Sequence, residues 1–449
     1  MMLDLLLINP RYHLLEEPIQ ENLGLGYIAS YLRSRGFSVE ILDGSLRGWS
    51  RRRMATEILK REFRALGVTV IYQGAAREQL AILKSLRKRG LRAHICVGGY
   101  FPSLSHRELI EDVPGIDSIV RGEGEYALED LLARLRAGVS PGGVLGLTYR
   151  EADGAIVENP ARPLIDDLDA LPFPARDELP LAFRRGGSMP LIASRGCYAL
   201  CNYCSIAAFY RMSKGPAWRG RSPGGILEEL EELFHTHDMR RVRFEDANFF
   251  GPGRDGPRRV GEIAEGILSR GLDMAFRIEC RAENVDEDLF RLLKKAGLKE
   301  VFVGVESAIP RALEAMKKGI TLDQNIQALD VLDRLNIRAG VGFIAVEPDT
   351  TLDEFFTNLR FVVERVHPMR KRTGSYVDPL SRLQVFTGTP LHKEMMERGM
   401  LEGDIYQMDY RLLDPTFRRF WAVFSPVQRA VYATKSWMKR HRLLKRTGF

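Results

Sequence analysis

The eleven residues Ser194-Arg195-Gly196-Cys197-Tyr198-Ala199-Leu200-Cys201-Asn202-Tyr203-Cys204 contain three of the five cysteines of this 449-residue chain. Their spacing, Cys-x3-Cys-x2-Cys, lets one loop wrap a small metal centre. Iron–sulfur clusters are held by short cysteine runs, usually through four thiolates. Because no fourth cysteine is near, one iron would keep an open coordination position, which is typical of reactive rather than structural metal sites.

Two other interpretations of the cysteines are weaker. Disulfides are disfavoured, because three clustered cysteines in a chain without a recognisable signal peptide suit a reducing compartment. A zinc site would need a fourth ligand, which His235 or His237 could supply only from a distance. Cys96 and Cys280 each stand in an apolar, strand-like run, and we predict packed thiols there rather than ligands.

The composition is that of a globular protein of two or three domains, with 45% hydrophobic and 28% charged residues. No apolar run approaches the length of a membrane span, and we expect a cytoplasmic protein. The net charge is +7, and residues 438–449 contribute five basic side chains and no acid. Such a run can bind nucleic acid, acidic lipid or an acidic partner, but a solvated terminus is the simpler interpretation.

Residues 1–140 alternate between strand and helix patterns. Strands are predicted at 3–10, 37–43, 67–72, 92–97 and 116–120, and helices at 28–35, 54–66, 78–89, 103–112 and 128–135. This alternation predicts an α/β fold with a doubly wound, Rossmann-like parallel sheet. Ligands of such sheets bind at the carboxyl ends of the strands.

The remaining chain divides into a linker (141–189), a second α/β domain (190–395) and a mainly helical C-terminal segment (396–449). The linker contains a hairpin around Asp153-Gly154 and an extended piece, Pro172-Phe173-Pro174. The second domain has predicted strands at 191–194, 241–246, 274–280, 301–307, 338–346 and 383–386. The last segment is predicted to be irregular over 400–410 and helical over 417–421 and 427–445.

The cysteine stretch resembles the signature of the radical S-adenosylmethionine (SAM) enzymes. The resemblance implies that Cys197, Cys201 and Cys204 hold a [4Fe–4S] cluster whose fourth iron is chelated by the amine and carboxylate of SAM. An electron from the cluster then cleaves SAM to a 5′-deoxyadenosyl radical. It also implies that residues 190–395 form a partial (β/α)6 barrel, with the cysteine loop at the carboxyl end of the first strand, the active face of α/β barrels.

Residues 1–140 resemble the cobalamin-binding domain of one large branch of this family. The resemblance rests on Asn9-Pro10, Leu25-Gly26-Tyr27, Asp43, Val97-Gly98-Gly99 and Arg121-Gly122-Glu123-Gly124-Glu125. Glycines at these turns would let the backbone approach cobalamin closely. The implied cobalamin-binding residues are Asn9, Gly26, Tyr27, Asp43, Ser45, Gly98, Gly99, Tyr100, Gly122 and Glu123.

This domain also departs from the family. Tyr100-Phe101 stands where the family often has Pro-His after the paired glycines. The Asp-x-His-x-x-Gly motif that supplies an axial histidine elsewhere is absent; Asp43 to Gly48 has its spacing, with Ser45 at the histidine position, which we take as coincidence. Cobalamin would then bind without a histidine ligand. The alternative is a flavodoxin-like sheet whose glycines only make turns.

Polar residues at the strand ends of the barrel are the implied SAM contacts. Glu245 and Asp246 would hold the methionine amine, and Arg281 would pair with the carboxylate. Glu306 and Ser307 would bind the ribose or the methionine end, and Tyr203 lies within the cysteine loop. The alternative is a network of ion pairs at the barrel mouth. Glu347-Pro348-Asp349-Thr350 departs from the family pattern on the adenine side.

The resemblance implies a cobalamin-dependent radical SAM enzyme, most often a methyltransferase. The methyl group of SAM would pass through methylcobalamin to an unactivated carbon of a small-molecule or peptide precursor. Two alternatives stay open: a cyclisation or rearrangement without methyl transfer, and a non-catalytic redox or sensor protein. We expect an external flavodoxin- or ferredoxin-type electron donor, no nucleic acid and a monomer.

Overall fold

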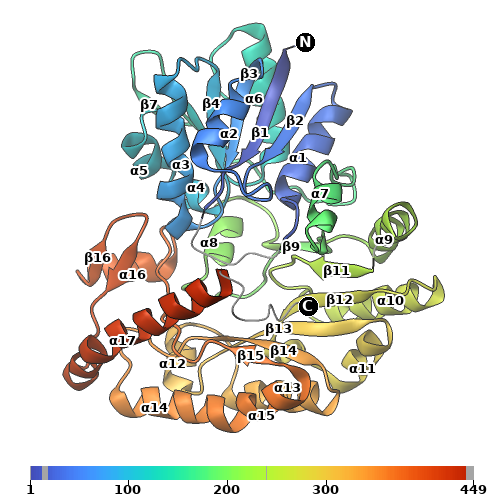
Figure 1. Cartoon of the computed structure of the whole chain (residues 1–449), viewed down its shortest axis with the longest axis vertical. Helices are drawn as coiled ribbons and strands as arrows, with labels where there is room; N and C mark the ends of the chain where they lie inside the picture. The colour runs from blue at the N-terminus through green and yellow to red at the C-terminus, as the bar shows by residue number, and fades with distance from the viewer. Residues whose placement is uncertain (1, 13–18, 239, 441–449) are drawn as a thin grey trace.

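The computed structural model describes residues 2–12, 19–238 and 240–440. It contains two large, mainly parallel sheets, one built by the N-terminal third of the chain and one by residues 189–377. The two sheets lie one above the other in Figure 1, and the C-terminal helix, in red, runs obliquely at the left of the lower one.

The N-terminal sheet has the strand order β2-β1-β3-β4-β5-β6-β7. The first five strands in the chain pair in parallel, and the last two form an antiparallel hairpin added to the edge at β5. The strands are β1 (Leu3–Asn9), β2 (Val39–Asp43), β3 (Phe63–Thr69), β4 (His94–Gly98), β5 (Ser118–Val120), β6 (Leu147–Arg150) and β7 (Ile156–Glu158). The hairpin predicted within residues 141–189 is therefore confirmed, and it extends this sheet.

Helices cover both faces of this sheet. They are α1 (Leu23–Ser34), α2 (Arg51–Ile58), α3 (Gln73–Lys88), α4 (Tyr100–Leu104), α5 (His106–Asp112) and α6 (Gly124–Ala137). Apolar residues of α1 and α6 pack on one face, and those of α2, α3 and α5 pack on the other. The predicted doubly wound sheet is confirmed.

The prediction of a helix over 54–66 is wrong at its end. Helix α2 stops at Ile58, and Phe63 begins β3, which pairs with β1. The strand is buried on both faces, as central parallel strands are, so it lacks the alternation that would have distinguished it from a buried helix.

The second sheet is a six-stranded parallel array with the order β15-β14-β13-β12-β11-β8. Its strands are β8 (Met189–Leu191), β11 (Arg241–Phe244), β12 (Ala275–Arg281), β13 (Leu298–Glu306), β14 (Arg338–Phe343) and β15 (Tyr376–Val377). The elements around it are α9 (Pro223–His237), α10 (Asp255–Ser269), η1 (Ala282–Asn284), α11 (Glu287–Lys295), α12 (Pro310–Ala315), α13 (Leu322–Arg334), α14 (Leu352–Phe361), η2 (Val362–Val366) and α15 (His367–Thr373). Each strand lies beside the next along the chain, which is the topology of a partial (β/α)6 barrel.

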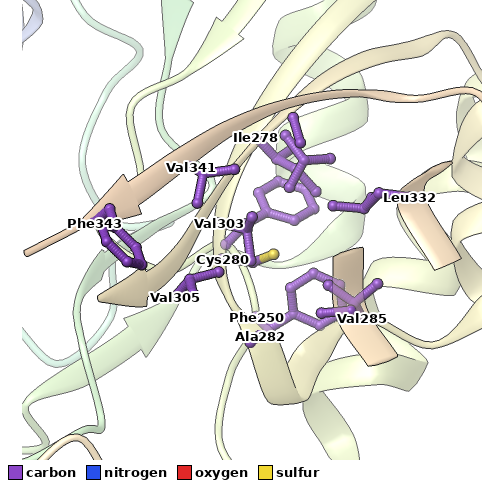
Figure 2. Close-up of a cluster of buried hydrophobic side chains, with 14 of the residues drawn as sticks. Phe250, Ile278, Cys280, Ala282, Val285, Val303, Val305, Leu332, Val341 and Phe343 are labelled. Carbon is purple, nitrogen blue, oxygen red and sulfur yellow. The ribbon is translucent and has the colours of Figure 1, made fainter. Parts of the chain in front are cut away.

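The apolar core of the barrel lies between the strands and the surrounding helices. Figure 2 shows part of it, with Ile278 and Cys280 of β12, Val303 and Val305 of β13 and Leu332 of α13. Cys280 is 5% exposed and Cys96, in the N-terminal sheet, is 3% exposed. Both are the packed thiols that the sequence predicts.

Two predicted barrel strands lie elsewhere. The first strand ends at Leu191, and residues 194–196 form β9 (Ser194–Gly196), which pairs with β10 (Trp218–Gly220) in a separate two-stranded sheet. The sixth strand is β15 and not residues 383–386, which follow an isolated bridge between Val346 and Arg382. A strand of two residues carries too little periodicity to be found from sequence.

The C-terminal segment packs against both domains. It contains α16 (Pro390–Glu397), the hairpin β16 (Leu401–Gly403) and β17 (Met408–Tyr410), and α17 (Pro415–Arg440). The hairpin replaces the predicted irregular stretch, and one helix with Pro426 inside it replaces the two predicted helices as far as residue 440. Residues 441–449, with the end of the second predicted helix and much of the basic tail, lie outside the described residues. None of the described helices is long and apolar enough to cross a membrane.

Candidate functional site at the joint of the two domains

The cysteine loop connects β9 to α8 (Ser205–Arg211) at the joint between the two domains. Gly196, at the end of β9, has φ of +86°, and a Cβ there would lie 1.9 Å from the carbonyl oxygen of Ala217. Asn202 anchors the loop to the barrel, because its backbone N–H donates to the Met316 carbonyl (3.2 Å) and its side-chain Nδ2 donates to the Ala315 carbonyl (2.9 Å). The loop is therefore fixed at both ends.

The three thiols of the loop are free and lie near one another. Cys201 is buried, whereas Cys197 and Cys204 are half-buried. Burial, together with the neighbouring Cys201 and Cys197 thiolates, raises the pKa of Cys204 to about 11. In the described part of the chain, no three His, Cys, Asp or Glu side chains are placed to hold a single metal ion. A [4Fe–4S] cluster places each thiolate on a different iron.

Two cations flank Cys201. Nη1 of Arg281, at the end of β12, lies 3.5 Å from the Cys201 sulfur, and its Nη2 donates to the Lys318 carbonyl. Lys318 is itself buried and forms an ion pair of 2.8 Å with Glu306. Burial would lower the pKa of Lys318, but the Glu306 carboxylate and the Cys201 thiolate outweigh it and raise that pKa. Fixed positive charge therefore stands beside a thiolate of the loop.

Glu306 ends β13 in a strained backbone conformation. Its φ is +64°, and the pairing of β13 with β14 shifts register there. Such strain is concentrated at functional sites, where the surrounding structure enforces it. Tyr203 lies beside Glu306. Burial, and then the negative charge of this carboxylate, raise the pKa of the Tyr203 phenol well above its usual value.

Ser307, the next predicted SAM contact, is fully buried. Its hydroxyl donates to Oδ1 of Asn358 (3.2 Å) and accepts from the Ile309 N–H (3.2 Å). These bonds hold the turn after β13.

The acidic pair after β11 divides into two environments. Asp246 is buried and accepts hydrogen bonds from the Ala193 N–H (3.1 Å) and the Ser194 hydroxyl. Burial raises its pKa from 3.8 to about 6. Glu245 instead lines the cavity described below, and it pairs with Arg243. Asp246 therefore positions the start of the cysteine loop, whereas Glu245 faces open space.

A ladder of ion pairs crosses the barrel sheet on the side opposite its apolar core. Arg243 lies 3.5 Å from Glu279, Arg277 lies 3.4 Å from Glu300, and Arg338 lies 3.2 Å from the same Glu300. Burial raises the pKa of Glu279 to about 7. This ladder lies deeper along the strands than Glu306 and contains none of the predicted SAM contacts. At the barrel mouth itself, Glu306 pairs with Lys318 and Arg281 pairs with Glu283.

A cavity of about 430 Å³ lies between the N-terminal sheet and the cysteine loop. Its lining includes strand ends of the N-terminal sheet, residues of α1 and α6, the segment 194–196 that leads into the loop, and Glu245. Gly98 is part of the wall, and a Cβ there would meet no atom closer than 3.8 Å. A side chain at 98 would therefore enter the cavity.

Seven of the ten predicted cobalamin residues line this cavity: Asn9, Tyr27, Gly98, Gly99, Tyr100, Gly122 and Glu123. The other three, Gly26, Asp43 and Ser45, are not among the lining residues. Gly26 packs against the connector, where a Cβ would lie 2.8 Å from the Ala175 carbonyl oxygen. Asp43 is buried and accepts hydrogen bonds from Asn9 Nδ2 (3.1 Å) and the Leu46 N–H (2.7 Å), so it shapes the turn after β2.

A buried charge cluster, which was not predicted from the sequence, joins the two domains. Arg195, two residues before Cys197, donates to Glu123 (3.0 Å) and Glu125 (2.6 Å), and Arg219 of β10 donates to Glu123 (2.9 Å). Burial would raise the pKa of Glu123, but the two arginines outweigh it and lower that pKa. The acids in the Gly122 to Glu125 motif and the arginine before the first cysteine were both visible in the sequence, but their pairing was not.

The donor groups present fit a cluster and a cobalamin. Three free thiols without a fourth cysteine in the loop suit a cluster with one open iron. A cavity at the carboxyl ends of parallel strands, with glycines among its lining residues, suits a large, flat cofactor. Because the cavity wall includes residues 194–196, a group bound there would lie close to the thiols.

Comparison with known proteins supports both halves. The B12 binding domain family matches residues 17–132, and the radical SAM superfamily matches residues 191–362. The chain is 30% identical over 342 residues to "Uncharacterized methyltransferase PH0819" of Pyrococcus horikoshii, covering 76% of this chain and 72% of that protein. It is 29% identical over 374 residues to 4′-phospho-dehydrooxetanocin synthase of Priestia megaterium, covering 78% of this chain and 49% of that protein.

The fold is also similar to a solved structure. The radical enzyme OxsB with aqua-cobalamin bound superposes with a TM-score of 0.77 at 25% identity, covering 92% of this chain and 65% of that one. The chain thus spans about half to three quarters of the length of these relatives. Further relatives carry the names of methyltransferases and of cyclases.

Proposed function

Since the chain belongs to the cobalamin-binding radical SAM enzymes and uses a [4Fe–4S] cluster, SAM and cobalamin, we propose that it is a methyltransferase acting on an unactivated carbon of a small-molecule or peptide precursor. The supporting observation is the cavity, which places glycine-walled space of the N-terminal sheet directly beside the cysteine loop. When bound, these groups supply one-electron cleavage of SAM and a methyl group carried on cobalt.

The three cysteines are proposed to hold the cluster. Arg281 and Lys318 neutralise charge at Cys201, and Asn202 fixes the loop to the barrel. Iron binding requires thiolates, so the raised pKa of Cys204 means that loading releases a proton.

The proposed SAM contacts fall into two groups. Glu245 and Glu306 have carboxylates in half-buried positions from which they can accept hydrogen bonds from an amine or a ribose. Asp246 and Ser307 are occupied by backbone and side-chain partners, so we propose that they position the neighbouring strand ends. Arg281 and Tyr203 stand between the cysteines and Glu306, where each can meet the methionine end of SAM.

On the cobalamin side, Gly98, Gly99 and Gly122 are proposed to leave space for the cofactor, with Asn9, Tyr27 and Tyr100 on the cavity wall. Glu123 is held by two arginines, and its proposed role is to keep the cavity and the cysteine loop together. Gly26, Asp43 and Ser45 support the turns behind this wall.

A cyclisation or rearrangement without methyl transfer is the second candidate, because one relative is named a synthase and another a cyclase. A non-catalytic redox or sensor protein is the third. All three would bind a cluster and a corrin, so the reaction separates them.

The test begins with SAM cleavage. Reduced, anaerobically prepared protein should release 5′-deoxyadenosine from SAM, and Cys201→Ala should abolish this release while the matched Cys280→Ala retains it. Absence of cleavage in the unaltered protein would favour the non-catalytic candidate. Transfer of label from methyl-labelled SAM into a product of candidate precursors would support methylation, whereas an unlabelled rearranged product would overturn it in favour of cyclisation.

A further inference from the structure

The C-terminal helix α17 carries no acidic residue. Its 26 residues contain the basic side chains Arg418, Arg419, Arg429, Lys435, Lys439 and Arg440, with neither Asp nor Glu. An ordinary surface helix mixes both signs along its polar face. The two of these basic residues whose side chains the structure describes, Arg418 and Arg419, are exposed. The described surface of this helix therefore carries charge of one sign only.

The inner face of α17 is anchored to the barrel. Phe417 and Trp421 are buried, and their rings lie 5.3 and 6.0 Å from the ring of Phe355 in α14. Further along the helix, Gln428 Nε2 donates to the Leu380 carbonyl (3.0 Å). The helix is thus seated by one face from its first turn to its middle.

The outward face of the same helix is also apolar. Val423 is 77% exposed and Val427 is 60% exposed, and Ala422, Pro426 and Ala430 are exposed beside them. These positions, spaced by one, three or four residues, form one stripe. A helix packed on a protein core normally turns polar residues to solvent, so this stripe is unexplained by the fold.

Exposed apolar side chains continue the stripe onto α14. Phe356 is 48% exposed, and its ring lies 6.0 Å from that of Phe420. Arg418 and Arg419 are exposed at the start of the helix, on the same turns as Phe420. We call Phe356, Val423 and Val427, with Arg418 and Arg419, the α17 face.

We propose that the α17 face docks on an anionic lipid bilayer surface. A second copy of this chain is a poor occupant, because it would bring two acid-free helices together. A bilayer accepts an apolar stripe without matching its shape, and anionic headgroups attract the flanking arginines. The proposed contact is made by one face of the helix at the membrane surface.

Docking in this way would place the open edge of the barrel next to the bilayer. Leu380 follows β15, the edge strand, and Gln428 of α17 bonds to it. A substrate embedded in the membrane would then lie near the barrel.

The test is co-sedimentation of the full-length holoprotein with vesicles of phosphatidylcholine alone or mixed with phosphatidylglycerol. The intact protein should bind the mixed vesicles, and binding should fall with added salt. Val423→Ser/Val427→Ser, which leaves the charge unchanged, should lower the binding constant by about tenfold. The control Val139→Ser/Leu268→Ser alters two exposed apolar residues outside this face and should bind as the unaltered protein does.

Circular dichroism and the urea midpoint of the variants must match those of the unaltered protein, which separates lost docking from lost folding. Equal binding to both vesicle types, no binding at low salt, or equal binding of the two double variants would overturn the proposal. If the protein ignores vesicles but binds polyglutamate in a manner that depends on Val423 and Val427, the α17 face docks an acidic protein instead, and the membrane proposal is wrong.

Discussion

The two sides of the joint between the domains differ in the kinds of residue that form them. On the side of the N-terminal sheet the cavity wall includes backbone and glycine, with Gly98 adding no side chain. On the barrel side, the thiols are surrounded by buried ion pairs and by cations at Cys201. On the cavity side, the wall needs only to leave space for a large cofactor. On the barrel side, a charged cluster and charged SAM need fixed charges of opposite sign, and these charges need partners of their own, as Lys318 has in Glu306.

The largest effect is expected where the two sides meet, at Arg195. Arg195→Met would leave Glu123 and Glu125 buried with fewer partners, which costs about 3–5 kcal/mol for a broken buried pair. The control Arg291→Met removes an exposed ion pair with Glu287 and should cost less than about 1 kcal/mol. Urea unfolding followed by circular dichroism measures both, and equal midpoints for the two variants would show that this cluster does not hold the joint.

The pH dependence of Asp246 tests the barrel side. Its folded pKa, about 6, lies above its usual 3.8, so the folded state binds the proton more tightly than the unfolded state. The contribution of Asp246 to the free energy of unfolding is therefore fully present below about pH 4, and it is lost as the pH rises through about 6. Relative to Asp246→Asn, the unaltered protein should lose on the order of 2 kcal/mol across this window.

Urea midpoints measured from pH 4 to 7 on both proteins isolate this group from other titrations. Parallel curves would mean that Asp246 has an ordinary pKa and is not buried as the structure has it.

The cavity side is tested by filling it. Gly98→Leu would place a side chain on the cavity wall, where a Cβ meets only Val120, at 3.8 Å, and cobalamin affinity should fall at least about tenfold, or about 1.4 kcal/mol. Gly261→Leu on α10, away from the cavity, is the matched control. Equilibrium dialysis against hydroxocobalamin measures the change, and unchanged binding by Gly98→Leu would place cobalamin elsewhere.

The smallest effect concerns the charge on the cluster side. Arg281→Gln removes a cation 3.5 Å from the Cys201 sulfur, which disfavours the reduced, more negative cluster. A change of about 1 kcal/mol corresponds to about 40 mV for a one-electron couple, and the midpoint potential should fall by this amount. Arg281→Lys should restore most of it. A redox titration followed by electron paramagnetic resonance, carried out without SAM, separates this effect from SAM binding. Identical midpoint potentials for Arg281→Gln and the unaltered protein would show that Arg281 does not stabilise the reduced cluster.

Local signals and long-range partners differ in how well the sequence predicts them. The cysteine spacing, the paired glycines and the alternation of strands and helices are local patterns that predicted the α/β fold, and the family resemblance that they carry implied seven residues that line the cavity. The pairing of Arg195 with Glu123 and Glu125 depends on chain segments some 70 residues apart, which no local pattern encodes. Strand β15 was not predicted either, because it is defined by its pairing with β14. The continuity of α17 across Pro426 was not predicted because it depends on tertiary packing.

The most direct test of the two-sided site is the iron and cobalt content of protein purified anaerobically from cells supplied with hydroxocobalamin. The account predicts about four irons and one cobalt per chain. The triple variant with Cys197, Cys201 and Cys204 changed to Ala should lose the iron and keep the cobalt, and Gly98→Leu should hold less cobalt and keep the iron. If either variant lost both metals, or if neither variant lost any metal, the result would contradict a site in which each side binds one cofactor.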